Sequence, residues 1–188
     1  MKRATTLFAI ILAALTLGSE VHAQKPSDSS EYLIKAGFIY NFAKFVAWPS
    51  SAFAKSDSPI VIGVLGDDSF AAVLGDVIDG KKIDGRAFVL KRLRWSKDPK
   101  DLKDCNILFI ASSESVHNDE IIQLLRGTST LSIADNTGFA KRGGIINFVL
   151  DDNNVRFEVN VDAAKQADLN ISSRLLSLAK IVTGLSWR

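Results

Sequence analysis

The sequence predicts a single α/β domain with a mixed β-sheet that has a parallel core, a C-terminal antiparallel hairpin, and helices on both faces. Short β-branched runs alternate with amphipathic stretches between residues 60 and 134. Strands separated by crossover helices pair in parallel. The run 107–110 is continuously apolar, which indicates a strand covered on both faces. These two observations predict the parallel core.

The elements of this core are justified in chain order. The first predicted helix, residues 31–48, is capped by Ser29 or Ser30 and stopped by Pro49, since a residue before proline disfavours the helical conformation. After Pro59, apolar runs and amphipathic periods define the rest. We expect strands at 60–65, 87–93, 105–110 and 131–134, and helices at 69–78 and 116–126.

The hairpin is predicted from the residues that follow. Two strand-like segments, 145–150 and 155–161, are joined by a polar turn at 151–154, a pattern typical of antiparallel pairing. Gly143 and Gly144 precede a strand rather than a helix, so we expect a backbone bend there and not a ligand loop. Two final helices are predicted at 162–167 and 172–182.

The first residues have the pattern of a secretory signal. Lys2 and Arg3 precede an apolar run at 7–17, and Val-x-Ala ends at Ala23. The run is too short to span a bilayer, which disfavours an uncleaved anchor. We therefore predict cleavage after Ala23 and export of the mature chain. The predicted organisation is a signal peptide (1–23), a flexible linker (24–30) and one domain (31–188).

Charge and composition argue against several function classes. Without the signal, 21 basic and 20 acidic residues remain, a formal net charge of +1. Binding to nucleic acid or to anionic lipid needs a clustered basic excess, so we expect neither partner. Only His117 and Cys105 remain as a possible zinc pair or catalytic base and nucleophile. We predict no catalytic residue, cofactor or metal site, with Cys105 a small buried residue and His117 a solvated one.

The first predicted helix has two apolar faces. Phe38, Phe42 and Phe45 form a stripe opposite the face that should meet the sheet. Such a stripe is buried by another part of the chain, here a C-terminal helix, or by a second subunit or a partner protein. We therefore take Phe38, Phe42 and Phe45 as the candidate partner-binding residues.

Three polar clusters follow the ends of predicted parallel strands, where α/β sheets open crevices. Individually they are what helix starts require, because Asp and Ser side chains accept hydrogen bonds from exposed backbone N–H groups. Together they could line a pocket for a small polar ligand. The candidate pocket residues are Asp67, Asp68, Ser112, Ser113, Glu114 and Asp135.

Several motifs, in order along the chain, resemble the YfiR family of bacterial periplasmic proteins. They are Phe38-Ile39-Tyr40-Asn41-Phe42-Ala43-Lys44-Phe45-Val46-Ala47-Trp48-Pro49, Ile62-Gly63-Val64-Leu65-Gly66-Asp67-Asp68, Gly138-Phe139-Ala140-Lys141-Arg142-Gly143-Gly144, Ile146-Asn147-Phe148, and Val155-Arg156-Phe157-Glu158-Val159-Asn160 with Ile171-Ser172-Ser173-Arg174-Leu175-Leu176.

The resemblance implies a regulator rather than an enzyme. YfiR proteins bind the periplasmic sensor domain of an inner-membrane diguanylate cyclase, YfiN, and so keep cyclic-di-GMP and biofilm formation low. An OmpA-like outer-membrane lipoprotein, YfiB, relieves this repression. Redox-responsive members carry paired cysteines, whereas this chain has only Cys105, so redox switching is not implied here. The two hypotheses are therefore a protein-binding repressor, with a possible homodimer, and a periplasmic receptor for a small ligand.

Overall fold

The structure is a computed structural model that describes residues 28–96 and 100–184. The predicted signal peptide and residues 24–27 of the predicted linker lie outside the described residues, whereas residues 28–30, also predicted as linker, form the start of the first helix. No helix within the described ranges is long and apolar enough to cross a membrane.

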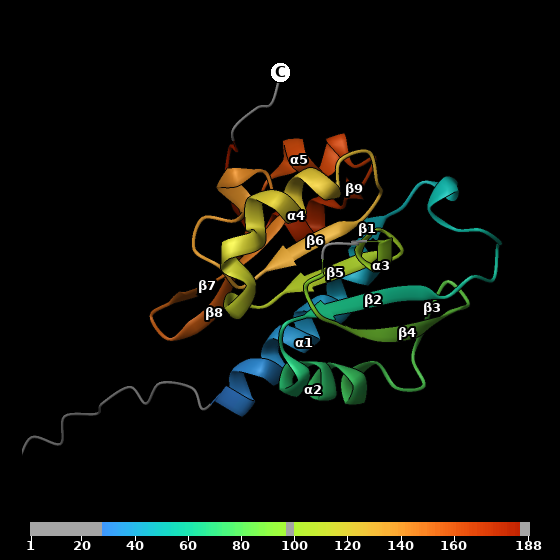
Figure 1. Cartoon of the computed structure of the whole chain (residues 1–188), viewed down its shortest axis with the longest axis horizontal. Coiled ribbons are helices and arrows are strands. Elements are labelled where there is room, and N and C mark those ends of the chain that lie inside the picture. The colour runs from blue at the N-terminus through green and yellow to red at the C-terminus, as the bar shows by residue number, and fades with distance from the viewer. Residues whose placement is uncertain (1–27, 97–99, 185–188) are drawn as a thin grey trace, which may run out of the picture.

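The described residues form one eight-stranded sheet in the order β10-β8-β7-β6-β5-β2-β4-β3 (Figure 1). Five neighbouring strands run in parallel from β4 through β7, and β7 and β8 form the antiparallel hairpin. The predicted parallel core and hairpin are therefore confirmed. The strands are β2 (Ile60–Leu65), β3 (Lys82–Ile83), β4 (Arg86–Leu93), β5 (Ile107–Ile110), β6 (Leu131–Ala134), β7 (Ile146–Asp151), β8 (Asn154–Val159) and β10 (Lys180–Ile181).

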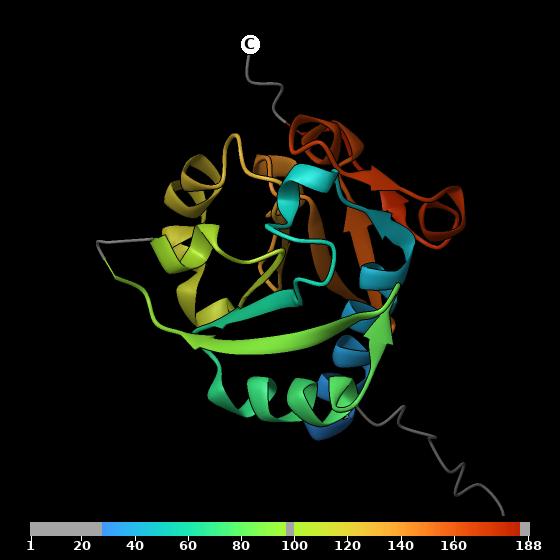
Figure 2. The ribbon, with the colours of Figure 1, turned by 90° about the vertical axis from the view of Figure 1, so that its right-hand side faces the viewer.

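Helices cover both faces of the sheet, as predicted (Figures 1 and 2). The larger core lies on the face covered by α1 and α2, and the smaller core lies beneath α4 on the other face. Every residue of β5 and β6 is buried, which accounts for their continuous apolar character. The helices are α1 (Asp28–Phe45), α2 (Asp68–Ile78), α3 (Lys100–Lys103), α4 (Asn118–Leu124), α5 (Val161–Gln166) and α6 (Ser173–Leu176), with 3-10 turns η1 (Ser50–Ala52), η2 (Ser112–His117) and η3 (Ala140–Arg142).

Local backbone chemistry explains the hairpin and the bend before it. Asp152 and Asn153 have φ of 47° and 61°, the two positive values that a tight hairpin turn requires. Gly143, with φ of 111°, ends η3 in the left-handed conformation. A Cβ on Gly144 would lie 2.0 Å from the Phe139 ring. Only glycine therefore fits at this position of the bend.

The first helix ends three residues earlier than predicted. Residues after Phe45 leave the helix and form β1 (Val46–Ala47), which pairs antiparallel with β9 (Asn170–Ile171). The N–H of Ser172 donates to the carbonyl of Phe45 at 2.9 Å. A partner strand distant in sequence thus takes the backbone groups that a further helical turn would have used.

The predicted helix 172–182 is wrong over most of its length. Only α6 is helical, and β10 then adds to the sheet in parallel with β8. Leu175 and Val182 are buried, but Leu178 is 67% exposed, so these residues do not share one face. Helical spacing favoured a helix, whereas the outer edge of β8 offers backbone partners, such as the carbonyl of Val159 for the N–H of Val182 at 2.9 Å. The short elements α3, β3 and η2 were not predicted.

Candidate functional site

The polar clusters predicted to line a pocket do gather at the carboxyl end of the parallel strands. The first turns of α1 cross this end and contact two of them. Asp67 lies between the end of β2 and the start of α2, and its carboxylate caps α2 by accepting from the N–H of Phe70 at 2.9 Å. Its second oxygen accepts from the hydroxyl of Tyr32 on α1 at 2.6 Å. Asp67 therefore holds two helices against the end of β2.

The cluster after β5 packs against the loop after β2. The Ser113 hydroxyl donates to the carbonyl of Gly66 at 3.1 Å. Gly66 has φ of 87°, and a Cβ there would lie 2.4 Å from Cγ of Glu114, so glycine allows the two loops to approach each other. Ser112 is exposed. Asp68 is also exposed and pairs with Arg94 at 3.2 Å.

Asp135, which follows β6, belongs to a buried ion-pair cluster. Lys35 of α1 is 2% exposed, and its ammonium lies 2.5 Å from carboxylate oxygens of both Asp135 and Glu31. The Lys35 ammonium is also 5.9 Å from the centre of the Phe148 ring. A buried cation needs such partners, since an unpaired one would be costly to desolvate. Glu31 and Lys35 stand four residues apart, a spacing that sequence analysis overlooked.

The predicted pocket residues are thus brought to one end of the sheet, where α1 engages several of them. Asp135 additionally lines a cavity of about 400 Å³ bounded by the loop after β6 and by strands β7 and β8. The cavity also contains Asn136, Lys141, Asn147 and Glu158. Glu158 is buried and its carboxylate lies 3.4 Å from the ammonium of Lys180.

Two buried amides in this cavity have unsatisfied atoms. Asn147 is fully buried, and its Oδ1 accepts from the N–H of Asn136 at 3.3 Å. Within the described part of the chain, Nδ2 of Asn147 and Oδ1 of Asn136 have no hydrogen-bond partner. These two amide atoms are themselves buried, and the polar side chains that line the cavity beside them include Asp135, Lys141 and Glu158.

The predicted partner-binding stripe lies mostly inside the molecule. Phe42 is 0% exposed, and its ring lies 5.0 Å from that of Phe157 and 5.9 Å from that of Phe148. Phe38 is half-buried against the same two rings. The Arg174 guanidinium lies 5.5 Å from the ring centre of Phe45. Phe42 cannot contact a partner in this structure, because strands β7 and β8 cover the stripe that was expected to meet a C-terminal helix or another protein.

The stripe continues toward the start of α1, and there it reaches the surface. Ile34 lies one turn before Phe38 and is 44% exposed, while its neighbour Leu33 is 58% exposed. Leu150 lies two residues after Phe148 on the same face of β7 and is 47% exposed. One helical turn is about 5.4 Å and two strand residues are about 6.6 Å, and both steps run toward the carboxyl end of the sheet. We call Leu33, Ile34 and Leu150 the α1–hairpin patch.

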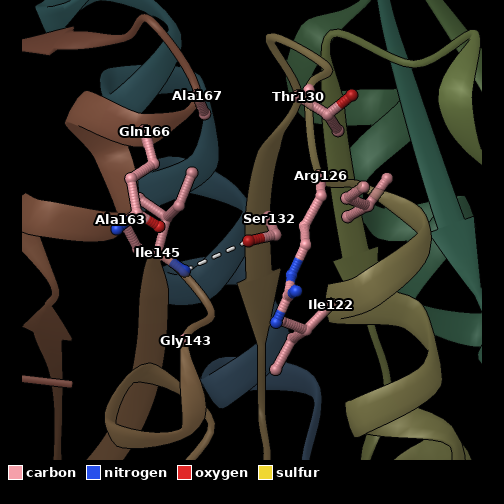
Figure 3. A pocket seen from close by; sticks show the side chains of 11 residues that line it. Ile122, Arg126, Thr130, Ser132, Gly143, Ile145, Ala163, Gln166 and Ala167 are labelled. Atoms are coloured by element: carbon pink, nitrogen blue, oxygen red, sulfur yellow. Dashed lines mark hydrogen bonds between the residues drawn. The ribbon is translucent and has the colours of Figure 1, made fainter. Parts of the chain in front are cut away.

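A further cavity opens where β6 and β7 diverge (Figure 3). Pairing between these strands is limited to Ile133↔Ile146 and Ala134↔Asn147. One residue before these pairs, the two strands are no longer joined through their backbones. There the N–H of Ile145 donates to the buried hydroxyl of Ser132 at 3.1 Å. The resulting cavity is about 270 Å³ and is bounded by the ends of α4 and α5.

The largest of the described cavities, about 640 Å³, lies at the opposite end of the sheet from Asp67 and Asp135. Phe45, Trp48 and Phe53 give it aromatic walls, and Arg86 stacks on Phe53 at 3.8 Å. Sequence analysis missed this cavity because its walls come from α1, η1, β3 and β9, which are distant along the chain.

The two residues considered for metal or nucleophilic chemistry lie apart. Cys105 is 3% exposed, and burial raises the pKa of its thiol to about 11, so it is the buried residue that was predicted. His117 is half-buried and stacks on Trp95 with ring centres 4.4 Å apart; the prediction of a solvated side chain is therefore corrected. The described residues contain no group of three or more metal-ligating side chains.

Comparison with known proteins gives one family match. A family model described as YfiR/HmsC-like matches residues 32–180, which include α1 from its second turn onward and all the described strands except Ile181 of β10. A comparison with curated proteins finds no match.

Proposed function

The chain belongs to the YfiR/HmsC-like family, and we propose that it represses an inner-membrane diguanylate cyclase by binding the cyclase's periplasmic sensor domain. The family is one of regulators and suggests a periplasmic role in cyclic-di-GMP signalling. A YfiN-like cyclase is the proposed partner, and a YfiB-like OmpA-type lipoprotein is the proposed antagonist. Family membership is the observation that carries the proposal.

The α1–hairpin patch supports a specific docking surface. Leu33, Ile34 and Leu150 are exposed. Ile34 lies one turn before Phe38 and Leu150 lies two residues after Phe148, and these two rings pack 6.2 Å apart and support the patch from the core. Apolar side chains fixed by such a support lose little conformational entropy on binding. The proposed surface thus replaces the predicted one, moving from the buried centre of the Phe38 stripe to its exposed beginning.

Repression by docking has an energetic requirement. A bound regulator shifts an equilibrium only by the difference between its affinities for the two states of its partner. We propose that the patch binds the inactive arrangement of the sensor domain more tightly than the active one. An antagonist that covers the same three side chains would compete directly and restore cyclase activity.

The test combines two substitutions on the patch with one matched control. Ile34→Asp and Leu150→Asp each place a carboxylate in the proposed interface. The control, Val116→Asp, places a carboxylate outside it, at a valine of η2 that is 83% exposed. Binding to the isolated periplasmic domain of a membrane diguanylate cyclase from the same organism is measured by calorimetry. We expect each patch variant to lose about 30-fold in affinity, or about 2 kcal/mol, and Val116→Asp to bind like the wild type.

Cellular cyclic-di-GMP gives the second measurement. Deletion of the gene should raise it, and complementation with the wild type or with Val116→Asp should lower it again. Complementation with Ile34→Asp should fail. Unchanged cyclic-di-GMP after deletion, together with no binding to the cyclase domain, would refute the repressor proposal.

A receptor for a small ligand is the second candidate, and the cavity beside Asp135 favours it. Asp135, Lys141 and Glu158 line it, and their charged groups would bind a ligand carrying both donors and acceptors. A thermal-shift screen with polyamines, sugars and nucleosides tests it. A ligand that stabilises the wild type but not Lys141→Ala or Glu158→Gln would support this candidate, and the absence of any such ligand would count against it.

A further inference from the structure

The two edges of the sheet differ in how they are covered. One edge ends in the two-residue strand β10. The other ends in the two-residue strand β3, which covers only the start of the eight-residue strand β4, at Arg86 and Ala87. No other described strand pairs with β4 on this side, from Phe88 to Leu93. Natural sheets usually keep edge strands short or covered, because a long open edge is a template for another strand.

The outward-facing backbone groups of β4 can be assigned from its pairing. The carbonyl of Leu93 accepts from the N–H of Gly66, so Leu93 faces β2. Successive residues of a strand direct their backbone groups to opposite sides. Phe88, Leu90 and Arg92 therefore direct theirs away from the sheet, consistent with the pairing of Arg86 to Ile83 on that side. No described strand pairs with these three residues on that edge.

This edge is also the most basic segment of a nearly neutral chain. Residues 81–96 contain six Lys and Arg and one acidic residue, Asp84, whereas the whole chain has a formal net charge of +2. Arg94 pairs with Asp68 and Arg86 donates to backbone carbonyls. Among the described residues, Lys91 and Arg92 have no carboxylate within ion-pair distance. Val89, between them and β3, is 41% exposed.

We propose that the open edge of β4 binds an extended acidic segment of a partner protein, which adds to the sheet as a ninth strand. Phe88, Leu90 and Arg92 would supply the backbone hydrogen bonds, and Lys91 and Arg92 would select carboxylates on the two faces of the added strand. A second copy of the chain is a poorer occupant, because its own β4 would bring like charges to the same edge. This surface is separated from the α1–hairpin patch by β2, β5 and β6 and does not depend on the proposed function.

Hydrogen exchange of the full-length mature protein tests the proposal residue by residue. The probe is a capped peptide of alternating Glu and Val, compared with the same peptide containing Lys in place of Glu. With the Glu peptide, we expect amide exchange of Phe88, Leu90 and Arg92 to slow by about tenfold or more, and that of Val89 and Lys91 to change little because their N–H groups already bond to β2. The Lys peptide should have no effect.

Substitutions at Arg92 separate backbone pairing from charge. Arg92→Pro removes one outward N–H at an edge position where proline is tolerated, and it should abolish the protection. Arg92→Glu keeps the N–H, and it should weaken Glu-peptide binding by about tenfold through charge reversal. Arg156→Ala, which removes an exposed cation from β8, is the matched control and should bind normally.

Three results would overturn the proposal. The first is equal protection by the Lys peptide, and the second is unchanged exchange at all three outward amides. The third is protection that rises with protein concentration in the absence of peptide, since this would identify a second copy as the occupant. If Arg92→Pro does not fold, Arg92→Glu still decides whether acidic charge is recognised.

Discussion

The apolar stripe of α1 is buried against the sheet around Phe42, whereas nearer the start of the helix, at Ile34, it is exposed to solvent. Phe42 is 0% exposed, whereas Ile34, two turns earlier on the same stripe, is 44% exposed. Both residues are large and apolar and lie on the same stripe, so the sequence alone does not distinguish them. The difference in exposure arises from the residues that pack opposite each one. Phe148 and Phe157 cover Phe42, while the hairpin beyond Leu150 turns back at Asp152 and Asn153. Periodicity identifies a stripe, but the reach of the opposing strands decides which part of it is core.

The largest effect is expected at the buried end. Phe42→Ala removes a ring that packs against two others and leaves a cavity, so we expect it to cost about 3 to 5 kcal/mol of stability. Denaturant unfolding of the mature protein measures this. A loss below 1 kcal/mol would mean that the stripe is not core, and the comparison between the two ends would fail.

A smaller loss is expected at Lys35, which lies between the two ends. Lys35→Met keeps the aliphatic stem but removes the ammonium from between Asp135 and Glu31. Because Asp135 is 34% exposed and can be solvated, we expect a cost of about 2 kcal/mol. The double variant Lys35→Met, Asp135→Asn should recover part of it, since Glu31 is then the one carboxylate of the cluster left without the ammonium. Additive losses in this double-mutant cycle would contradict coupling of the two residues.

The strands, the hairpin and the contact between Lys35 and Asp135 show what the sequence can and cannot predict. Alternation of apolar runs identified the parallel strands, since β5 and β6 are buried on both faces. Turn residues identified the hairpin at Asp152 and Asn153. The contact of Lys35 with Asp135 could not be predicted, because the two residues are one hundred positions apart and no local pattern reports such a contact. Only the spacing of Glu31 and Lys35 was a local signal.

The wrong prediction of a helix at 172–182 has the same cause, a contact between residues that are distant in the sequence. Residues 172–182 have helical spacing, yet β10 forms because the outer edge of β8 offers backbone partners at Glu158 and Val159. The structure places the predicted ligand residues at one end of the sheet, but whether they bind a ligand stays a prediction. The sequence could not show that Tyr32 and Lys35 of α1 would already contact Asp67 and Asp135.

The contact between Tyr32 and Asp67 should contribute less than the Lys35 cluster. Tyr32→Phe removes one hydrogen bond to a carboxylate that still accepts from the N–H of Phe70. We expect a loss of about 1 kcal/mol and faster amide exchange in the first turns of α1, with no change near Phe42. Uniformly faster exchange along α1 would show instead that the helix opens as one unit, and the two ends would then not be independent.

The smallest effect on stability is expected at the exposed end. Ile34→Ser and Leu150→Ser replace side chains that are 44% and 47% exposed, so each should change the free energy of unfolding by no more than about 0.5 kcal/mol. Phe42→Ser, by contrast, should unfold the protein or nearly so. If Ile34→Ser and Leu150→Ser are stable and still lose the cyclase domain, the exposed end is an interface that folding does not require. A loss of more than 1 kcal/mol at Ile34 would place it in the core with Phe42 and leave the α1–hairpin patch without a separate role.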